Sequence, residues 1–179
     1  MSKWIPFVVY VALIWAANLA IERWGFVSVG FGLMAPAGVW FAGLAFSARD
    51  WTQEWLGRRW VVVAILVGAA VSWLISPAFA VASGAAFLAS ETVDFAAYTF
   101  LRRRNRYAAV IVSNAVGSVI DSLLFLYLAF GSTRFWEGQV VGKLWTVIPA
   151  VVLIWLWRSR DLSQRMRARR SPTGGGRDA

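Results

Sequence analysis

Residues 60–101 read WVVVAILVGAAVSWLISPAFAVASGAAFLASETVDFAAYTFL, an apolar run of 42 residues with only two charges. A helix that crosses the apolar core of a bilayer needs about 20 residues, so this run is long enough for two crossings. Pro77 lies near its middle, and proline breaks helices because it lacks an N–H donor. The run therefore predicts two membrane-spanning helices, over 60–76 and 78–101, joined by a tight turn.

Further apolar runs lie on both sides of this segment. The first, over 4–21, exceeds the apolar region of a signal peptide, which is about 7–15 residues long, so we interpret it as an uncleaved span. The chain is 59% hydrophobic and 15% charged, with mean hydropathy +0.60, whereas soluble domains are about 25% charged. The sequence predicts an all-α integral membrane protein, with one domain over 1–160 and six transmembrane helices at 4–21, 24–48, 60–76, 78–101, 107–130 and 138–157.

Basic residues are divided unevenly between the two sides of this arrangement. Fifteen of the 18 fall on the side of the N-terminus: Lys3, three arginines between 49 and 59, four between 102 and 106, and seven between 158 and 177. Because short cytoplasmic loops are enriched in Lys and Arg, both ends of the chain are predicted to be cytoplasmic. The tail, residues 161–179, is basic and glycine-containing, which predicts a disordered cytoplasmic segment.

The charge and the missing residue types exclude several classes of protein. The net charge of +9 comes from short arginine runs between apolar stretches, a membrane pattern, so we expect no nucleic-acid binding. The chain has no Cys and no His, which removes disulfide frameworks, thiolate metal sites and Ser-His triads. We therefore expect no catalytic residues, no metal, no cofactor and no enzyme activity.

Several spans carry polar residues at depths where polarity is costly. Such residues usually face a cavity or a partner. Glu91, Asp94 and Tyr98 share one helix face because they are three and four residues apart. The other stripes are Asn114, Ser118, Asp121 and Ser122 in the fifth span, Gln139, Lys143 and Thr146 in the sixth, and Asn18 in the first. Their overlapping depths predict a common aqueous cavity.

The polar residues of these stripes have different expected roles. Asp121 and Lys143 are candidates for an ion pair, whereas Glu91 and Asp94 have no obvious basic partner at their depth. The hydroxyl residues favour a simple role in joining helices. The carboxylates favour a functional role, because they join helices poorly in hydrocarbon.

A polar cluster after the second span admits two interpretations: Asp50, Gln53, Glu54 and Arg58 can line a functional site or belong to an interfacial helix with an i,i+4 pair.

The adjacent carboxylates of Glu91 and Asp94 suit a ligand with adjacent donors, such as N1–H and the 2-amino group of a guanine-like base. Phe87, Phe95 and Tyr98 could stack on its ring. Protons or cations would also suit carboxylates.

The residues of spans four and five resemble the VUT family of vitamin uptake transporters, also known as queuosine precursor transporters. The similarity extends from about residue 10 to residue 157. It is carried by the runs 89–95, 101–104 and 113–130, with supporting similarity at Ala17-Asn18, Asp50 and Lys143.

The resemblance implies uptake of a 7-deazaguanine base, preQ0 or preQ1, across the cytoplasmic membrane of a prokaryote. It also implies a six-helix fold similar to the S components of energy-coupling-factor transporters. This chain departs from the family pattern at Glu91, where an amide is common. Together with the stripes, the resemblance gives a substrate-binding set of Asn18, Glu91, Asp94, Tyr98, Asn114, Asp121 and Lys143, with Asp50, Glu54 and Gln139 as gating candidates.

Two modes of transport remain open. The chain can be a stand-alone carrier, or an S-component-like binding module that needs an ATPase-driven partner; another vitamin-like heterocycle is a further alternative as substrate. Ala12, Ala16 and Ala20 form a small-residue stripe where a partner could dock, although such stripes occur at any helix contact. The expected partners are a nucleobase-like small molecule, the lipid bilayer, and either a second copy of the chain or a transporter subunit.

Overall fold

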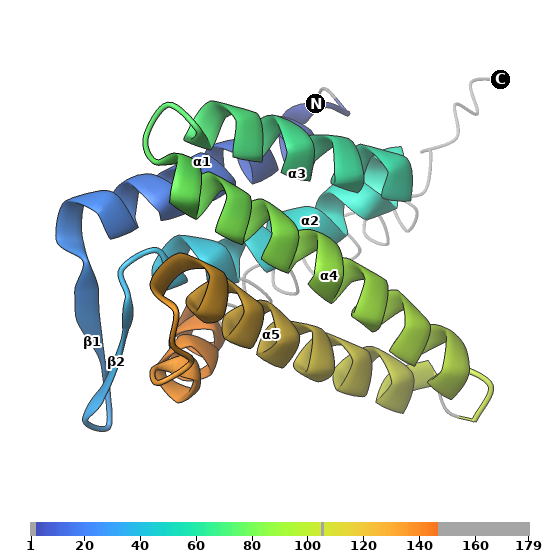
Figure 1. Cartoon of the computed structure of the whole chain (residues 1–179). Coiled ribbons are helices and arrows are strands. Elements are labelled where there is room, and N and C mark those ends of the chain that lie inside the picture. Colours follow the sequence, from blue (N-terminus) through green and yellow to red (C-terminus); the bar gives the residue numbers. More distant parts are fainter. Residues whose placement is uncertain (1–2, 105, 147–179) are drawn as a thin grey trace, which may run out of the picture.

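The computed structural model describes residues 3–104 and 106–146, and helices dominate it (Figure 1). The second half of the expected sixth span, 147–157, and the expected tail, 161–179, lie outside the described residues. A helical segment over 136–146 follows the last labelled element. In chain order the elements are α1 (Ile5–Trp24), β1 (Phe26–Gly30), β2 (Leu33–Pro36), α2 (Val39–Leu56), α3 (Arg58–Ser72), α4 (Pro77–Leu101) and α5 (Arg106–Phe130).

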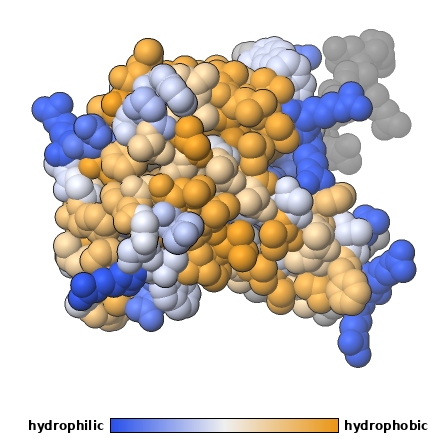
Figure 2. Space-filling view, in the orientation of Figure 1, coloured by the Kyte–Doolittle hydropathy of each residue, from blue (hydrophilic) through white to orange (hydrophobic). Residues whose placement is uncertain are grey.

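Three of the described helices are long and apolar enough to cross a membrane. They are α1, α4 and the part of α5 from Val112 to Phe130. Figure 2 shows apolar residues over most of the visible face, with hydrophilic residues gathered mainly at its edges. A surface of this kind is suited to lipid, because soluble proteins rarely expose large contiguous apolar patches. The chain is therefore a helical membrane protein, and the number of six spans stays a prediction.

The break predicted inside the long apolar run is present. α3 ends at Ser72 and α4 begins at Pro77. The Ser76 hydroxyl accepts a hydrogen bond from the backbone N–H of Phe79 at 3.4 Å. Pro77 takes the first helical position, where the missing N–H has no cost. The same residues that interrupt the apolar run therefore start the next helix.

The predicted helix over 24–48 is wrong in its first half. Strands β1 and β2 pair there as an antiparallel hairpin, and α2 begins only at Val39. Gly30 and Gly32 in the turn have φ of 93° and 73°, a conformation that glycine adopts without steric cost. Pro36 ends the second strand. The protein is therefore mainly, but not wholly, helical.

α2 continues through the polar stretch that the sequence suggested as a cytoplasmic loop or an interfacial helix. It ends at Leu56, and Gly57 with φ of 90° separates it from α3. Glu54 and Arg58 consequently belong to different helices, so the expected i,i+4 pair on one helix does not form. Instead, α2 carries its polar end alongside α4.

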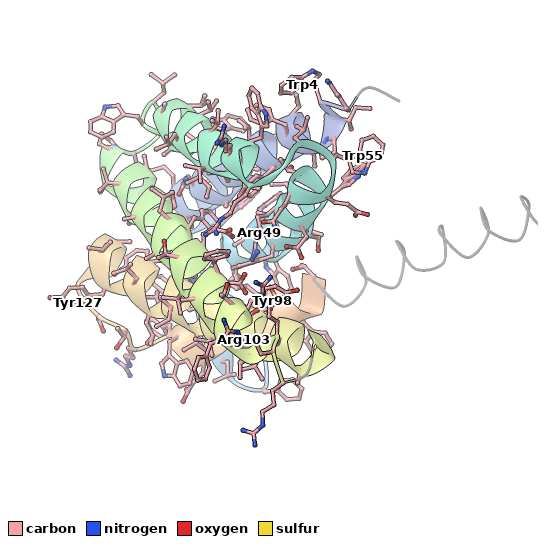
Figure 3. The ribbon with its side chains drawn as sticks, turned by 90° about the vertical axis from the view of Figure 1, so that its right-hand side faces the viewer. Trp4, Arg49, Trp55, Tyr98, Arg103 and Tyr127 are labelled. Carbon is pink, nitrogen blue, oxygen red and sulfur yellow. The ribbon has the colours of Figure 1, made fainter. Side chains whose placement is uncertain are left out.

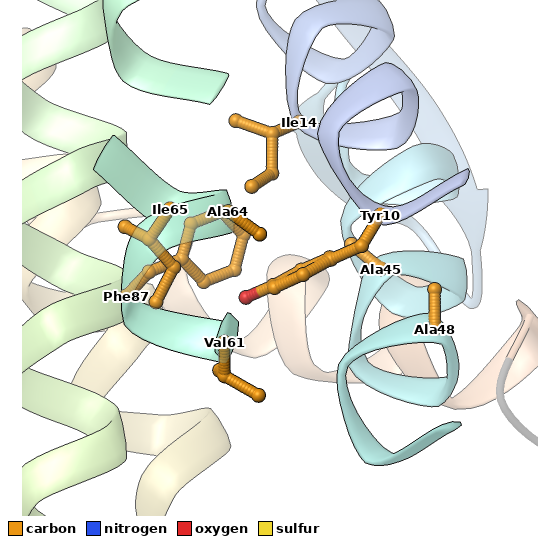
Figure 4. Close-up of a cluster of buried hydrophobic side chains, with 8 residues drawn as sticks. All are labelled: Tyr10, Ile14, Ala45, Ala48, Val61, Ala64, Ile65 and Phe87. Atoms are coloured by element: carbon orange, nitrogen blue, oxygen red, sulfur yellow. The ribbon is translucent and has the colours of Figure 1, made fainter. Parts of the chain in front are cut away.

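The apolar core joins the first four helices. Tyr10 and Ile14 of α1 contact Ala64 and Ile65 of α3, and Phe87 of α4 closes the cluster (Figure 4). The rings of Tyr10 and Phe87 meet edge to face with centroids 6.4 Å apart. α4 and α5 form the most extensive helix pair beside this core (Figure 1). These contacts fix α2 and α4 relative to each other, which positions the polar residues described below.

The helical segment 136–146 packs tightly against α2. A Cβ atom added at Gly43 would lie 2.7 Å from the carbonyl oxygen of Lys143 and would also overlap the Thr146 hydroxyl. Small residues let helices approach closely in membranes, and Gly43 supplies that space here. The close contact brings Lys143 to the interior beside α5, where it meets Asp121.

Candidate functional site

A polar cavity of about 420 Å³ lies between α2, the start of α3, α4 and α5. Figure 3 shows Arg49 and Tyr98, which belong to α2 and α4, in the same region of the molecule. Two arginines and four carboxylates contribute to its wall. The lining residues are Arg49, Asp50, Gln53, Glu54, Arg58, Glu91, Asp94, Phe95, Tyr98, Ser113 and Asn114.

Helical spacing explains why these side chains converge. Glu91, Asp94 and Tyr98 form one face of α4, as their spacing predicted. On α2, Arg49 and Gln53 are one turn apart, and the turn at Gly57 brings α3 back to the same cavity. The site is therefore built from both halves of the described chain.

Arg49 is the centre of an ionic cluster in the cavity wall. It is only 5% exposed. Its Nε lies 2.6 Å from Oε1 of Glu91, and its Nη1 lies 3.6 Å from Oδ2 of Asp94 and 3.3 Å from Oδ1 of Asp50. The two intramembrane carboxylates, for which the sequence offered no basic partner, therefore share a buried arginine.

Arg49 is absent from the site predicted from the sequence, because it falls in the predicted cytoplasmic loop after the second span. The signal that could have found it is the helical period of α2. Ala45, Ala48, Arg49 and Thr52 are all buried at offsets of 0, 3, 4 and 7, the pattern of one buried helix face. Extending the second span beyond residue 48 with this period would have placed Arg49 inside the protein.

Two aromatic residues of α4 line the same cavity. The guanidinium carbon of Arg58 lies 3.7 Å from the centroid of the Phe95 ring, a cation–π contact across the cavity wall. Phe95 is 51% exposed and Tyr98 is half-buried. Phe87, the third aromatic residue expected at the ligand, belongs to the apolar core instead.

Asp121 and Lys143 form a second, separate ionic cluster. Nζ of Lys143 lies 2.5 Å from Oδ2 of Asp121 and donates to Oγ of Ser122 at 2.7 Å and to the carbonyl oxygen of Ser118 at 3.4 Å. Lys143 is 2% exposed and Asp121 is 4% exposed. The pairing considered from the sequence is present, and it is fully enclosed in the protein.

The expected common cavity is divided in two. Asn18, Asp121 and Gln139 line a small pocket of about 30 Å³ that shares no lining residue with the larger cavity. In this pocket the amide nitrogen of Asn18 donates to Oγ of Ser83 at 3.1 Å. The physical reason is distance along α5, because Asn114 and Asp121 are two helical turns, about 10 Å, apart. Of the predicted set, the structure brings Asp50, Glu54, Glu91, Asp94, Tyr98 and Asn114 together, and places Asn18, Asp121, Gln139 and Lys143 away from them.

Phe46 lies between the two ionic clusters. Its ring centroid is 5.7 Å from the guanidinium carbon of Arg49 and 5.4 Å from Nζ of Lys143. The ring also meets Phe87 edge to face at 6.1 Å. Phe46 thus contacts both ionic clusters and the ring of Phe87, which lines the small pocket.

The described residues contain no group of three or more acidic, His or Cys side chains that could hold a metal ion. The cavity instead offers carboxylate acceptors, guanidinium donors and aromatic faces. Chemically, this arrangement can bind a small planar molecule that donates hydrogen bonds and stacks on a ring.

An apolar helical exterior around a charged internal cavity defines a membrane protein with a buried polar site. Residues 73–158 match the family model described as "Putative vitamin uptake transporter", and this match supports the family predicted from the sequence. The matched segment contains α4, α5 and segment 136–146, but it leaves out α1 and α2, and therefore Arg49. No curated protein and no solved structure matches the chain.

Proposed function

We propose that this protein is a stand-alone carrier that imports a 7-deazaguanine precursor of queuosine into the cytoplasm. The family match supports uptake of a vitamin-like compound. The observation that carries the proposal is the cavity of about 420 Å³ that joins two largely enclosed carboxylates, those of Glu91 and Asp94, to two aromatic side chains. Small-molecule sites commonly have volumes of about 300–1,000 Å³, so a bicyclic base has room there.

The chemistry of the cavity supports a guanine-like edge. Glu91 and Asp94 lie one helical turn apart and accept hydrogen bonds, while N1–H and the 2-amino group of a deazaguanine are adjacent donors. Oδ1 of Asp94 is buried and has no hydrogen-bond partner among the described residues. Phe95 or Tyr98 would stack on the ring, and Asn114 would orient it.

The position of the cavity supports access from the cytoplasm. Tyr98 and Asn114 lie within about two helical turns of the basic connection between α4 and α5. Positive-inside topology puts that connection, with Arg102, Arg103 and Arg104, on the cytoplasmic side. The proposal therefore includes a plasma membrane location, six spans and cytoplasmic ends, with the cavity open toward the cytoplasm.

The S-component-like alternative has no specific support in the described residues. Ala20, in the small-residue stripe suggested as a docking surface, is 1% exposed and packs inside the protein. Ala12 is exposed and lines a shallow apolar groove with Trp15, which is the ordinary surface of a lipid-facing helix. The stand-alone carrier is therefore the function that we put to the test.

Rescue of uptake in cells that cannot make preQ0 tests this proposal. Cells that express the protein are given preQ0, preQ1 or queuine separately, and queuosine in their tRNA is measured. We expect queuosine to return with preQ0 or preQ1 at external concentrations that do not rescue cells with an empty vector. Failure of every base, with the protein present in the membrane, would contradict the substrate. Rescue of another vitamin auxotroph instead would indicate a different heterocycle.

A further inference from the structure

Arg49 occupies the two acceptors that the proposed substrate would use. Its guanidinium lies against both Glu91 and Asp94 in the cavity wall, at 2.6 Å and 3.6 Å. A guanidinium is a planar fork of N–H donors, and the N1–H and 2-amino edge of a guanine-like base has the same chemistry. The side chain therefore resembles the donor edge of the ligand.

Arg49 does not make all the hydrogen bonds that its guanidinium N–H groups allow. Its Nε, although close to Oε1 of Glu91, lacks hydrogen-bond geometry with any partner among the described residues. Its Nη1 lies nearer to Oδ1 of Asp50, at 3.3 Å, than to Oδ2 of Asp94, at 3.6 Å. A bidentate arginine–carboxylate pair with two good hydrogen bonds would be much harder to open.

Asp50 offers the guanidinium a second place to bind. Its side chain is 60% exposed, compared with 10% for Glu91 and 18% for Asp94. Asp50 also lines the cavity, so a small rotation of the Arg49 side chain would exchange the buried carboxylates for a solvated one. The two positions are adjacent because both aspartates already contact Nη1.

We propose that Arg49 is an internal competitor of the substrate: it pairs with Glu91 and Asp94 when the site is empty and shifts to Asp50 when a donor ligand takes them. This inference rests on the proposed function. Two ionised carboxylates without a counter-ion are costly in a membrane protein interior. Arg49 compensates them in the empty carrier, so the unloaded protein can change conformation.

The proposal predicts that substitution of Arg49 has opposite effects on two quantities: substrate binding becomes tighter, and net transport becomes slower. Arg49→Lys keeps the positive charge but removes the fork, so it competes less well. We expect the dissociation constant of neutral preQ0 for the purified variant to fall about ten-fold if the open state is a minority of about 10% in the native protein. Because the charge is unchanged, a tighter complex cannot come from a more negative cavity.

Arg49→Gln removes the competitor and the counter-ion together. In proteoliposomes, exchange of labelled preQ0 for internal preQ0 should continue, because the loaded carrier does not need Arg49. Net uptake, which requires return of the empty carrier, should fall at least about ten-fold. Arg59→Gln is the matched control, because it removes the same charge from an exposed residue of α3 outside the cavity and should leave both rates unchanged.

These measurements decide whether Arg49 competes with the substrate. Tighter preQ0 binding by Arg49→Lys, or exchange without net uptake in Arg49→Gln, supports the competitor. Weaker binding by Arg49→Lys, with a folded variant shown by its unfolding temperature, overturns it and leaves Arg49 as a residue that merely holds the carboxylates in place. If the unchanged protein neither binds nor transports preQ0 or preQ1, the proposed function itself fails, and the inference falls with it.

Discussion

Charged residues inside the protein are compensated in two different ways. Asp121 has one dedicated partner, Lys143, and the pair is enclosed. Glu91 and Asp94 instead share Arg49 at the wall of a cavity. The first arrangement is typical of a structural ion pair, whereas the second leaves acceptor capacity for a ligand. Substitutions of Glu91 and Asp94 should therefore change uptake, whereas substitutions of Asp121 and Lys143 should change stability.

Substitutions in the cavity should remove uptake without unfolding the protein. Asp94→Asn and Glu91→Gln each replace an acceptor by a group that also presents N–H donors toward the donor edge of the base. Because a hydrogen bond to a charged group contributes about 1.5–3 kcal/mol, uptake of labelled preQ0 or preQ1 should fall about ten-fold or more. Membrane insertion should be intact by immunoblot. Normal uptake by both variants would rule out this pair as the substrate site.

Substitutions in the enclosed pair should act mainly on stability. Lys143→Ala leaves the Asp121 carboxylate buried without its counter-ion, which costs about 3–5 kcal/mol. The double variant Lys143→Ala with Asp121→Ala removes both charges and should be closer to the unchanged protein than the sum of the single effects. Reversible unfolding in mixed detergent measures all three variants. Additive losses would show that the two residues do not interact.

At the scale of elements, the sequence predicted the central helices well and the hairpin poorly. α4 and α5 follow from long apolar runs bounded by Pro77 and by arginines, features that act locally. Residues 26–36 are equally apolar, so hydropathy alone does not separate a hairpin from a helix there. The strands depend on the glycine turn and on pairing across it, which a count of apolar residues does not register.

In the candidate site, too, features within one helix could be predicted and contacts between helices could not. Glu91, Asp94 and Tyr98 could be grouped from helical spacing alone. Their contact with Arg49 could not, because it depends on how α2 packs against α4. Depth along each helix predicts Asn18 and Asp121 at the same cavity, but depth does not say which way a helix face points, and both residues line the small pocket instead.

The contact between α2 and the segment 136–146 should be intolerant of larger residues. In Gly43→Val, the new side chain would overlap the backbone of Lys143 and the Thr146 hydroxyl. Overpacking typically costs about 1–3 kcal/mol, so the unfolding temperature should drop. Leu44→Val is the control, because Leu44 is an exposed neighbour of Gly43 on the same helix and the change adds no atoms to a helix contact. An unchanged unfolding temperature for Gly43→Val would contradict this packing.

At the scale of the whole molecule, the proposed carrier has its large cavity open toward the cytoplasm. The absence of cysteine makes this directly testable, since any introduced thiol is unique. Asn114→Cys should react with a membrane-impermeant maleimide in inside-out vesicles and not in intact cells. Ser83→Cys, in the small pocket, should react from neither side, because Ser83 is buried. Labelling of Asn114→Cys from the outside of cells would reverse the assigned orientation.

The central claim is that this chain alone moves a deazaguanine base across a membrane. Uptake of labelled preQ0 and preQ1 by the purified protein in liposomes, with protein-free liposomes as the blank, measures it most directly. We predict saturable uptake by the unchanged protein and uptake at least about ten-fold lower by Asp94→Asn. Ligand binding without transport would indicate a module that needs a partner, and neither binding nor transport would contradict the proposed function.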